Sequence, residues 1–333
     1  MSKQQILLLG ATGETGKSIL NGLVEDGSFD LTLLIRPSSA NKDDVKELQE
    51  KGFKTAIIDI ESGVDSLAKA FSGFDTFISA TGPGSQLTQL DLVEAAVRAG
   101  IKRFVPCGFI TICPRGGIMM LRDHKEEVHD RMFLHKLPFT IIDVGYWHQI
   151  SFPRLPSGKV NYASIRPNQT IHAGGDAPNL LTDLRDIGRY VALIVKDERT
   201  LNKRVVTYSD VLSENQIFDM LEEVSGEKIE RDYMSKEDIE KAVKQAEANY
   251  EANPNDAMIA RSLYGIQYIN SKYVRVDNAP EVAKYLGYLD ANELYPDFKP
   301  VKMAEFYKEL LEGKGTMVYE KTIAKEMARA GGK

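Results

Sequence analysis

The stretch Ile6–Gly16 reads ILLLGATGETG, a short apolar run followed at once by a turn with three glycines. The run Ile6–Leu9 predicts a buried strand, and the amphipathic sequence Gly16–Asp26 predicts a helix. Strand, tight glycine turn and helix in this order are typical of the first unit of a dinucleotide-binding sheet. A helix that begins here directs unpaired backbone N–H groups and its positive dipole end at the turn.

Each glycine of the turn has a predicted role. Gly10 permits the tight turn, Gly13 lets the backbone approach a pyrophosphate, and Gly16 lets the helix pack close to the sheet. The alternative is a glycine turn that binds nothing, which the flanking strand and helix disfavour. The residues expected to contact a cofactor from this turn are Gly10, Thr12, Gly13, Glu14, Thr15 and Gly16.

The same alternation of apolar runs and amphipathic stretches continues through residues 1–150. We predict strands at Ile6–Leu9, Leu31–Ile35, Lys54–Ile58, Thr76–Ser79, Arg103–Pro106 and Phe139–Val144. We predict helices at Gly16–Asp26, Lys42–Lys51, Val64–Phe71, Gln86–Ala99 and Met119–His135. The expected fold class is α/β, a Rossmann-type doubly wound parallel sheet that forms an NAD(P)-binding domain.

The sequence pattern changes after Trp147, where prolines and glycines divide the chain into short strands and loops. Helical patterns return at Leu184–Lys196, Glu214–Ser225, Ser235–Tyr250 and Ala304–Glu312. We expect residues 151–313 to form a smaller, mixed α+β substrate lobe interleaved with the first domain. Residues 314–333 are expected to be a polar C-terminal tail.

The end of the second strand favours NADPH over NADH. NAD-dependent enzymes usually place an acidic residue there to bind the ribose hydroxyls. This chain instead has Arg36, with Ser38 and Lys42 close behind. An arginine fork, a hydroxyl and an ammonium suit a 2′-phosphate. The alternative is that Arg36 is an ordinary solvated charge.

Further cofactor contacts are expected where the later strands end, because ligands of such sheets bind beyond the carboxyl ends of the strands. These contacts are Ala80, Thr81, Gly82, Pro106, Cys107 and Gly108. Cys107 has two interpretations, a nucleophile or a small buried wall residue. The second is favoured because no histidine and acid partner is evident nearby in the sequence.

Composition excludes several classes of function. The net charge of −6 opposes a nucleic acid or an anionic membrane as partner. The two cysteines, Cys107 and Cys113, lack a second metal-type pair, so we expect neither a metal site nor a disulfide scaffold. The apolar run near the N-terminus is too short for a signal or a membrane span. We expect a cytoplasmic protein that binds a small molecule, with a homodimer left open.

The chain resembles the isoflavone reductase-like branch of the NmrA-like family, atypical relatives of the short-chain dehydrogenases. GATGETG and LIRPSS are similar to its pyrophosphate and 2′-phosphate motifs. The resemblance continues through KEEVHDRMFLHKLPFT at Lys125–Thr140, DIGRYVALIVKDERTLNK at Asp186–Lys203 and LYPDFKPVKMAEFY at Leu294–Tyr307. It extends to about residue 313.

The resemblance implies a catalytic lysine. In the family this lysine lies thirteen residues before the proline of the next strand, a position that matches Lys125 counted back from Pro138. A lysine beside a nicotinamide can donate a proton or stabilise an oxyanion, and it can also hold the cofactor. The alternative is a solvent-facing helix lysine. His129, one turn further on, either assists a proton relay or is a surface histidine.

Five residues are expected to line the substrate pocket: Phe109, Met119, Tyr146, Trp147 and His148. The sequence after the fifth strand departs from the plant form, which leaves the substrate undetermined. The resemblance implies an NADPH-dependent reductase of a small conjugated, phenolic or quinone-like compound of secondary metabolism. The alternative is an NmrA-type dinucleotide sensor without turnover, which generally lacks the lysine.

Overall fold

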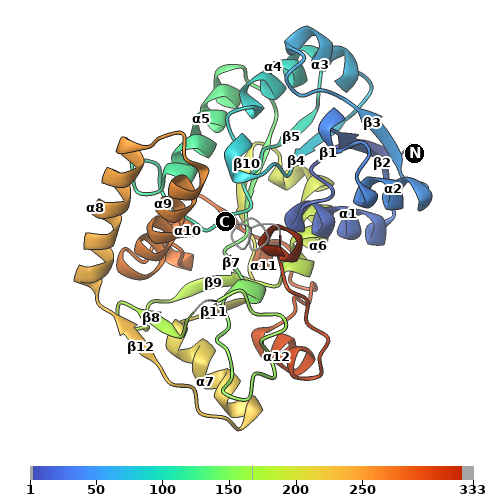
Figure 1. The fold of residues 1–333 in the computed structure, drawn as a ribbon. Helices are drawn as coiled ribbons and strands as arrows, with labels where there is room; N and C mark the ends of the chain where they lie inside the picture. The colour runs from blue at the N-terminus through green and yellow to red at the C-terminus, as the bar shows by residue number, and fades with distance from the viewer. Residues whose placement is uncertain (1–2, 167, 325–333) are drawn as a thin grey trace.

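A five-stranded parallel sheet forms around the glycine turn in the computed structural model, which describes residues 3–166 and 168–324 (Figure 1). The strands are β1 (Gln4–Leu9), β2 (Phe29–Ile35), β3 (Lys54–Ile57), β4 (Thr76–Ser79) and β5 (Arg103–Val105). Their order is β3-β2-β1-β4-β5, so the chain builds outward from β1 in both directions. The predicted Rossmann-type doubly wound sheet is confirmed.

Helices cover both faces of this sheet. They are α1 (Glu14–Asp26), α2 (Asp43–Glu50), α3 (Val64–Phe71), α4 (Gln89–Ala99) and α5 (Met120–Leu134). Alternate residues of β1 point to opposite faces. Ile6 and Leu8 join the core that contains Ile19 of α1, whereas Leu7 joins the core that contains Val128 of α5. Burial on both faces explains why the strand is apolar throughout.

The second half of the chain contributes to the same layer. A bridge between Phe104 and Phe139 leads from β5 to three further parallel strands. These are β6 (Thr140–Asp143), β10 (Lys203–Val206) and β13 (Leu289–Asp290), in the order β13-β10-β6. Helix α6 (Leu184–Val195) packs against α1, and Figure 1 shows the two helices side by side.

Two glycines permit this close packing of α1 on α6. A Cβ added to Gly188 would lie 1.7 Å from the Ser18 carbonyl oxygen, and one added to Gly22 would lie 2.1 Å from the Gly188 carbonyl carbon. The Ser18 hydroxyl donates to the Leu184 carbonyl at 2.5 Å and accepts from the Gly188 N–H at 2.9 Å. The first layer therefore depends on contacts between residues 166 and 170 positions apart.

The remaining elements form a smaller mixed lobe. Strands β7 (Tyr146–Trp147), β9 (Asn179–Thr182) and β11 (Asp210–Leu212) make one sheet, and β8 (Thr170–His172) pairs with β12 (Asp232–Met234). The helices are α7 (Glu214–Ser225), α8 (Lys236–Ala252), α9 (Ala257–Ile269), α10 (Pro280–Tyr285), α11 (Ala291–Leu294) and α12 (Met303–Leu311). A π-helical turn, η5 (Asn270–Val274), follows α9, and short 3₁₀ turns occupy Pro37–Ser39 (η1), Pro83–Ser85 (η2), His148–Ile150 (η3) and Glu198–Thr200 (η4).

This lobe contains helices that the sequence prediction lacks. Helices α9, α10 and α11 were not predicted, and of the α9 residues only Leu263 and Gln267 are buried. The predicted polar tail at 314–333 is described as far as Ala324, and the last residues of that prediction lie outside the described ranges.

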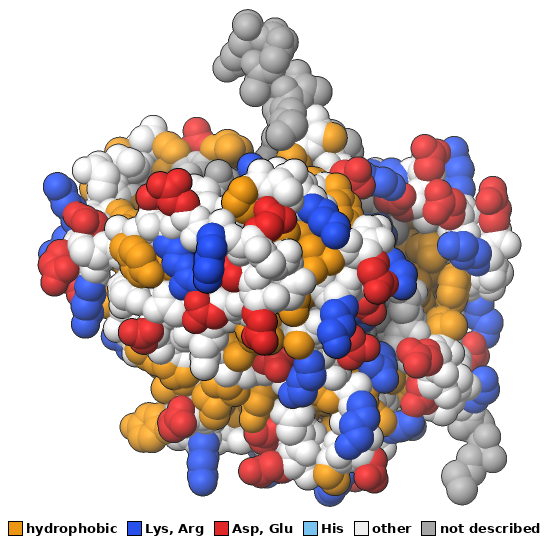
Figure 2. All heavy atoms as spheres, turned by 90° about the horizontal axis from the view of Figure 1, so that it is seen from below, with side chains coloured by type: hydrophobic (Ala, Val, Ile, Leu, Met, Phe, Trp, Pro, Cys, Tyr) orange, Lys and Arg blue, Asp and Glu red, His pale blue; other side chains and the backbone are white. Residues whose placement is uncertain are grey.

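None of the described helices is both long and apolar enough to cross a membrane. On the face drawn in Figure 2, basic and acidic side chains are interspersed over the surface.

Candidate active site

In the glycine turn after β1, Gly10 and Gly16 pack closely against the protein backbone, whereas the space around Gly13 is open to a ligand. Gly10 has φ +89°, and a Cβ there would lie 2.3 Å from the Ala80 carbonyl oxygen. A Cβ on Gly16 would lie 1.9 Å from the Gly10 carbonyl oxygen, whereas one on Gly13 would meet nothing closer than 3.5 Å. Helix α1 begins after Gly13 without a side-chain cap. Its first N–H groups are thus available to an anion, and the turn fits a pyrophosphate.

A basic group lies where β2 ends, beside β1. The side chain of Arg36 is exposed, and its guanidinium forms no hydrogen bond or ion pair within the described part of the chain. Ser38 is exposed in η1, and the Lys42 ammonium donates to the Ser39 hydroxyl at 3.0 Å. These three predicted residues lie between positions 36 and 42, in the segment that joins β2 to α2. An unpaired guanidinium here is suited to a phosphate.

The loops after β4 and β5 are joined at Cys107. Its Sγ donates to the Thr81 carbonyl oxygen at 3.1 Å, and its N–H donates to Gln89 Oε1 at 2.9 Å. Pro106 and Gly108 on either side are buried, and a Cβ on Gly108 would lie 2.5 Å from the Ile142 carbonyl oxygen. The predicted contacts after the two strands therefore form one wall, next to Gly10 and Ala80.

Lys125 reaches this wall from α5. Its side chain is buried, with 3% of the residue exposed, so it is not the solvent-facing lysine of the alternative interpretation. Its ammonium donates to the Cys107 carbonyl oxygen at 2.5 Å and to Gln86 Oε1 at 3.1 Å. Burial lowers the pKa of Lys125, and the nearby Arg122 charge lowers it further. An amine held in this way can give up a proton more easily than a surface lysine.

An ion pair one turn earlier on α5 sets the position of Lys125. Arg122 is completely buried and donates to Asp143 Oδ2 at 2.9 Å and to the Thr111 carbonyl oxygen at 2.7 Å. Asp143 ends β6 and also accepts from the Tyr288 hydroxyl at 2.5 Å. Because residues three apart on a helix share a face, this pair presses the face that carries Lys125 onto the ends of the strands.

His129 does not meet Lys125. Its Nδ1 lies 3.2 Å from Glu126 Oε2, and Glu126 in turn accepts two hydrogen bonds from Arg204, at 2.8 and 2.6 Å. The histidine is fully buried, and burial lowers its pKa. His129 is therefore not the surface histidine of one interpretation, and it contacts Glu126, the carboxylate that pairs with Arg204.

The predicted pocket residues divide into two groups. Phe109, Met119 and Trp147 are buried, and Phe109 has the positive φ of +52°. Tyr146 is half-buried and lies 6.2 Å from Tyr268 of α9 between ring centroids. Neither phenol hydroxyl hydrogen-bonds to another residue of the described ranges, so both can serve a ligand.

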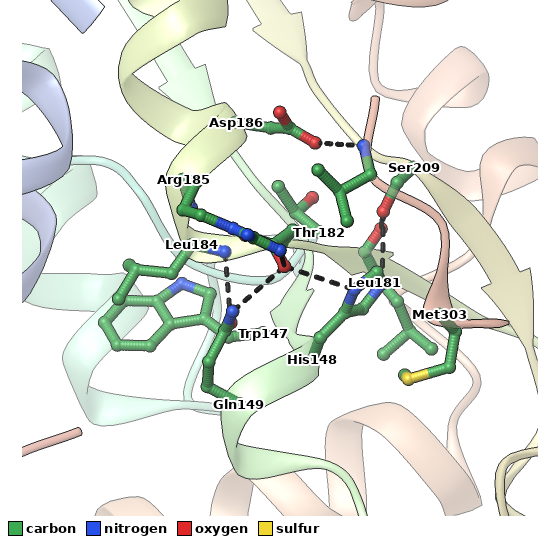
Figure 3. A network of polar contacts seen from close by, with 12 residues as sticks. Trp147, His148, Gln149, Leu181, Thr182, Leu184, Arg185, Asp186, Ser209 and Met303 are labelled. Carbon is green, nitrogen blue, oxygen red and sulfur yellow. Dashed lines mark hydrogen bonds and ion pairs between the residues drawn. The ribbon is translucent and has the colours of Figure 1, made fainter. Parts of the chain in front are cut away.

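His148 belongs to a network that anchors this segment to α6 (Figure 3). Its Nε2 lies 3.1 Å from the Ser209 hydroxyl, and its Nδ1 lies 3.9 Å from Asp183 Oδ2. Asp183 caps α6 and accepts from Gln149 at 3.0 Å. The structure does not bring His148 to Lys125. Through this network, the residue instead fixes the backbone that carries Tyr146 and Trp147.

Two residues of the site carry no signal in the sequence. Gln86 links the amine of Lys125 to the Gly82 carbonyl, which accepts from Gln86 Nε2 at 3.0 Å. Lys272 of η5 is 2% exposed, and its ammonium lies 3.1 Å from the centre of the Tyr146 ring. Gln86 follows a loop and Lys272 lies in the unpredicted α9–η5 segment, so only the folded chain brings them to the site.

Comparisons with known proteins agree with this architecture. The chain is 35% identical over 323 residues to the asnovolin J 5′,6′-dehydrogenase of Aspergillus novofumigatus, covering 96% of this chain and 98% of that one. It is 26% identical over 320 residues to an isoflavone reductase-like protein of Olea europaea, covering 93% and 99%. Among solved structures, the leucoanthocyanidin reductase–NADPH complex of Vitis vinifera superposes with a TM-score of 0.77 at 21% identity, covering 92% and 99%. The model of the NmrA-like family matches residues 2–307, and the chain belongs to that family.

Proposed function

We propose that this protein is an NADPH-dependent oxidoreductase that transfers a hydride to a small conjugated, phenolic or quinone-like metabolite. The observation that carries the proposal is the buried ammonium of Lys125, held by Cys107 and Gln86 at the edge of the sheet where the glycine turn opens. A buried amine at the ligand-binding end of a parallel sheet is the arrangement expected of a proton donor.

The residues at this edge fit NADPH. The N–H groups that begin α1 suit the pyrophosphate, and the unpaired Arg36 with Ser38 and Lys42 suits the 2′-phosphate. The wall of Ala80, Thr81, Gly82, Pro106, Cys107 and Gly108 would hold the rest of the cofactor. When bound, NADPH supplies the hydride.

Lys125 would complete the reaction. Reduction of a conjugated carbonyl builds negative charge on the substrate oxygen, and the ammonium both stabilises that charge and supplies the proton. Hydride and proton together account for the two hydrogens gained by the substrate. Since burial lowers the pKa of Lys125, the proton leaves more readily, and water restores it afterwards.

The relatives support a redox activity without fixing the substrate. The similar Aspergillus protein is named as a dehydrogenase and the olive protein as isoflavone reductase-like, and both names denote redox chemistry. The phenol hydroxyls of Tyr146 and Tyr268, which have no hydrogen-bond partner in the described ranges, suit an aromatic or conjugated ring with oxygen substituents.

The test is turnover by the purified protein and by Lys125→Met. NADPH oxidation is followed with a panel of quinones and phenolic enones, and NADP⁺ reduction with the matching saturated compounds. We expect Lys125→Met to lower kcat by about 10²–10⁴-fold. The NADPH Kd should stay within about threefold, since the 2′-phosphate and pyrophosphate contacts remain.

The exposed Lys69 of α3 provides the control Lys69→Met, which should leave turnover unchanged. Turnover by Lys125→Met at the wild-type rate would exclude the assigned role. NADPH binding by the wild-type protein without turnover of any compound in either direction would favour a dinucleotide sensor instead.

A further inference from the structure

The chain continues past the family region and returns to the cofactor edge of the sheet. The NmrA-like match ends at residue 307, and α12 ends at Leu311. The described residues 315–324, here called the C-terminal strap, then run from the smaller lobe to the glycine turn. At the start of the strap the Gly315 N–H donates to the Tyr162 hydroxyl at 2.9 Å, and that hydroxyl donates to the Leu310 carbonyl at 2.8 Å.

The middle of the strap contacts the substrate wall and the glycine motif together. The ring of Tyr319 stacks on Trp147, with centroids 5.9 Å apart and an interplanar angle of 20°. The Tyr319 N–H donates to Glu14 Oε1 at 3.0 Å, and the preceding Val318 is 2% exposed. Tyr319 has φ +58°, so its contacts hold a backbone conformation that non-glycine residues rarely adopt.

The end of the strap reaches the helix that follows the 2′-phosphate candidates. Lys321 forms an ion pair with Asp44, in the first turn of α2 and two residues after Lys42. This hydrogen-bonded ion pair lowers the pKa of Asp44. The strap thus follows the edge of the sheet from the predicted nicotinamide end to the predicted 2′-phosphate end.

The charges along this path match a phosphorylated ligand. Glu14 and Asp44 are carboxylates placed next to the two predicted phosphate sites, where they would repel a dinucleotide. The strap gives a backbone N–H to the first carboxylate and an ammonium to the second. Within the strap, Lys321 places its ammonium next to the predicted 2′-phosphate site.

We propose that the C-terminal strap is part of the cofactor site and closes over a bound dinucleotide, with Tyr319 as the residue that positions it against Trp147 and the glycine turn. This inference rests on the proposed function, because it takes NADPH as the ligand. The strap contacts the glycine turn through Tyr319 and α2 through Lys321, so a dinucleotide bound beneath it would leave only after these contacts break.

The test uses the single tryptophan of the chain, Trp147, as a reporter of the strap. Tyr319→Ala and a chain that ends at Gly313 are compared with the full protein and with Tyr285→Ala, which removes an exposed tyrosine elsewhere. NADPH release is timed by stopped flow after a chase with excess NADP⁺. Tryptophan emission is recorded with and without NADP⁺, and trypsin cleavage after Lys321 is followed in the same samples.

We expect Tyr319→Ala to speed NADPH release by about three- to tenfold, the fold-change that corresponds to one aromatic pair. The truncated chain should release NADPH at least as fast as that variant, and Tyr285→Ala should match the wild type. Saturating NADP⁺ should protect Lys321 from trypsin in the full protein, and both strap variants should change the Trp147 emission before any cofactor is added.

Three outcomes would overturn the proposal. The first is an equal rate of NADPH release from the truncated and full proteins. The second is tighter NADPH binding after truncation, because the strap would then compete with the cofactor. The third is unchanged trypsin cleavage at Lys321 with saturating cofactor. Failure of the proposed function has a different signature. In that case the full protein and the truncated chain both fail to bind NADPH, while the Trp147 emission still reports the contact with Tyr319.

Discussion

At the scale of single residues, the site depends on which charged groups are paired and which are left unpaired. Lys125 and Arg122 are both buried, and both have oxygen partners at 2.5–3.1 Å. Arg36 is exposed at the end of β2 and has no hydrogen-bond or ion-pair partner among the described residues. Burying a cation costs free energy unless oxygens surround it, whereas an exposed guanidinium costs little to keep ready for a ligand.

Arg36→Ala should therefore act on the cofactor and hardly at all on the fold. Removing a charge-assisted contact of about 1.5–3 kcal/mol predicts an NADPH Kd about 10- to 150-fold higher. The NADH Kd should stay within about threefold, because NADH lacks the 2′-phosphate. Calorimetric titration of both cofactors measures the difference.

Arg98→Ala is the matched control for this prediction. Arg98 is an exposed arginine of α4 whose partner is Asp65 at the surface, away from the strand ends. It should leave both affinities unchanged. The assigned 2′-phosphate site would be wrong if Arg36→Ala weakened NADPH and NADH equally.

At the scale of elements, the packing of α1 on α6 fixes the start of the cofactor-binding helix. Gly188 of α6 lies so close to α1 that a Cβ would fall 1.7 Å from the Ser18 carbonyl oxygen. We expect Gly188→Ala to destabilise the protein by about 1–3 kcal/mol, because the helices must separate to admit a methyl group. Urea unfolding, followed by circular dichroism, gives the change in the free energy of unfolding.

Gly265→Ala in α9 is the matched helical control. A Cβ there meets nothing within 4 Å, and alanine favours a helix over glycine by about 1 kcal/mol. This variant should be as stable as the wild type or more so. If both variants changed stability by the same amount, helix propensity would explain the result and the proposed close contact would not.

The sequence predicted the elements that rest on local patterns and missed those features that depend on contacts between distant elements. The strand at Ile6–Leu9, its glycine turn and the helix after it were predicted well, since each rests on a local pattern. The burial of Lys125 could not be read from its neighbours, because it depends on the Arg122–Asp143 pair that joins α5 to the end of β6. The α9–η5 segment was not predicted as helical, so the surroundings of Tyr146 were missed with it.

At the scale of the whole molecule, one buried amine couples the stability of the fold to pH. Lys272 is 2% exposed, and its Nζ lies 3.1 Å from the Tyr146 ring centre and 3.2 Å from the Tyr273 hydroxyl. Glu214 favours its charged form and Arg166 opposes it. Burial outweighs these charges and lowers the pKa of Lys272 to about 7. The unfolded chain, with an ordinary lysine pKa, binds a proton that the folded chain lacks above this pH.

The sign of the effect follows from this difference in bound protons. Below about pH 7 the amine is protonated in both states, so folding carries the full cost of burying the charge. Between about pH 7 and the ordinary lysine pKa, the unfolded state binds more protons, and this group makes the folded state more stable as pH rises. Lys272 can raise the free energy of unfolding by at most about 1.4 kcal/mol per pH unit in this range.

Lys272→Met should remove this dependence while keeping the length and apolar stem of the side chain. Urea unfolding of the wild type and the variant between pH 6 and pH 10 gives the difference in free energy of unfolding, from which all other titrations cancel. We expect the free energy of unfolding of the wild type to rise relative to that of the variant as pH rises above about 7. Lys284→Met, at an exposed position of α10, should give a flat difference. A flat difference for Lys272→Met as well would mean that Lys272 keeps its proton inside the fold, with the faces of the tyrosine rings compensating for the lost water.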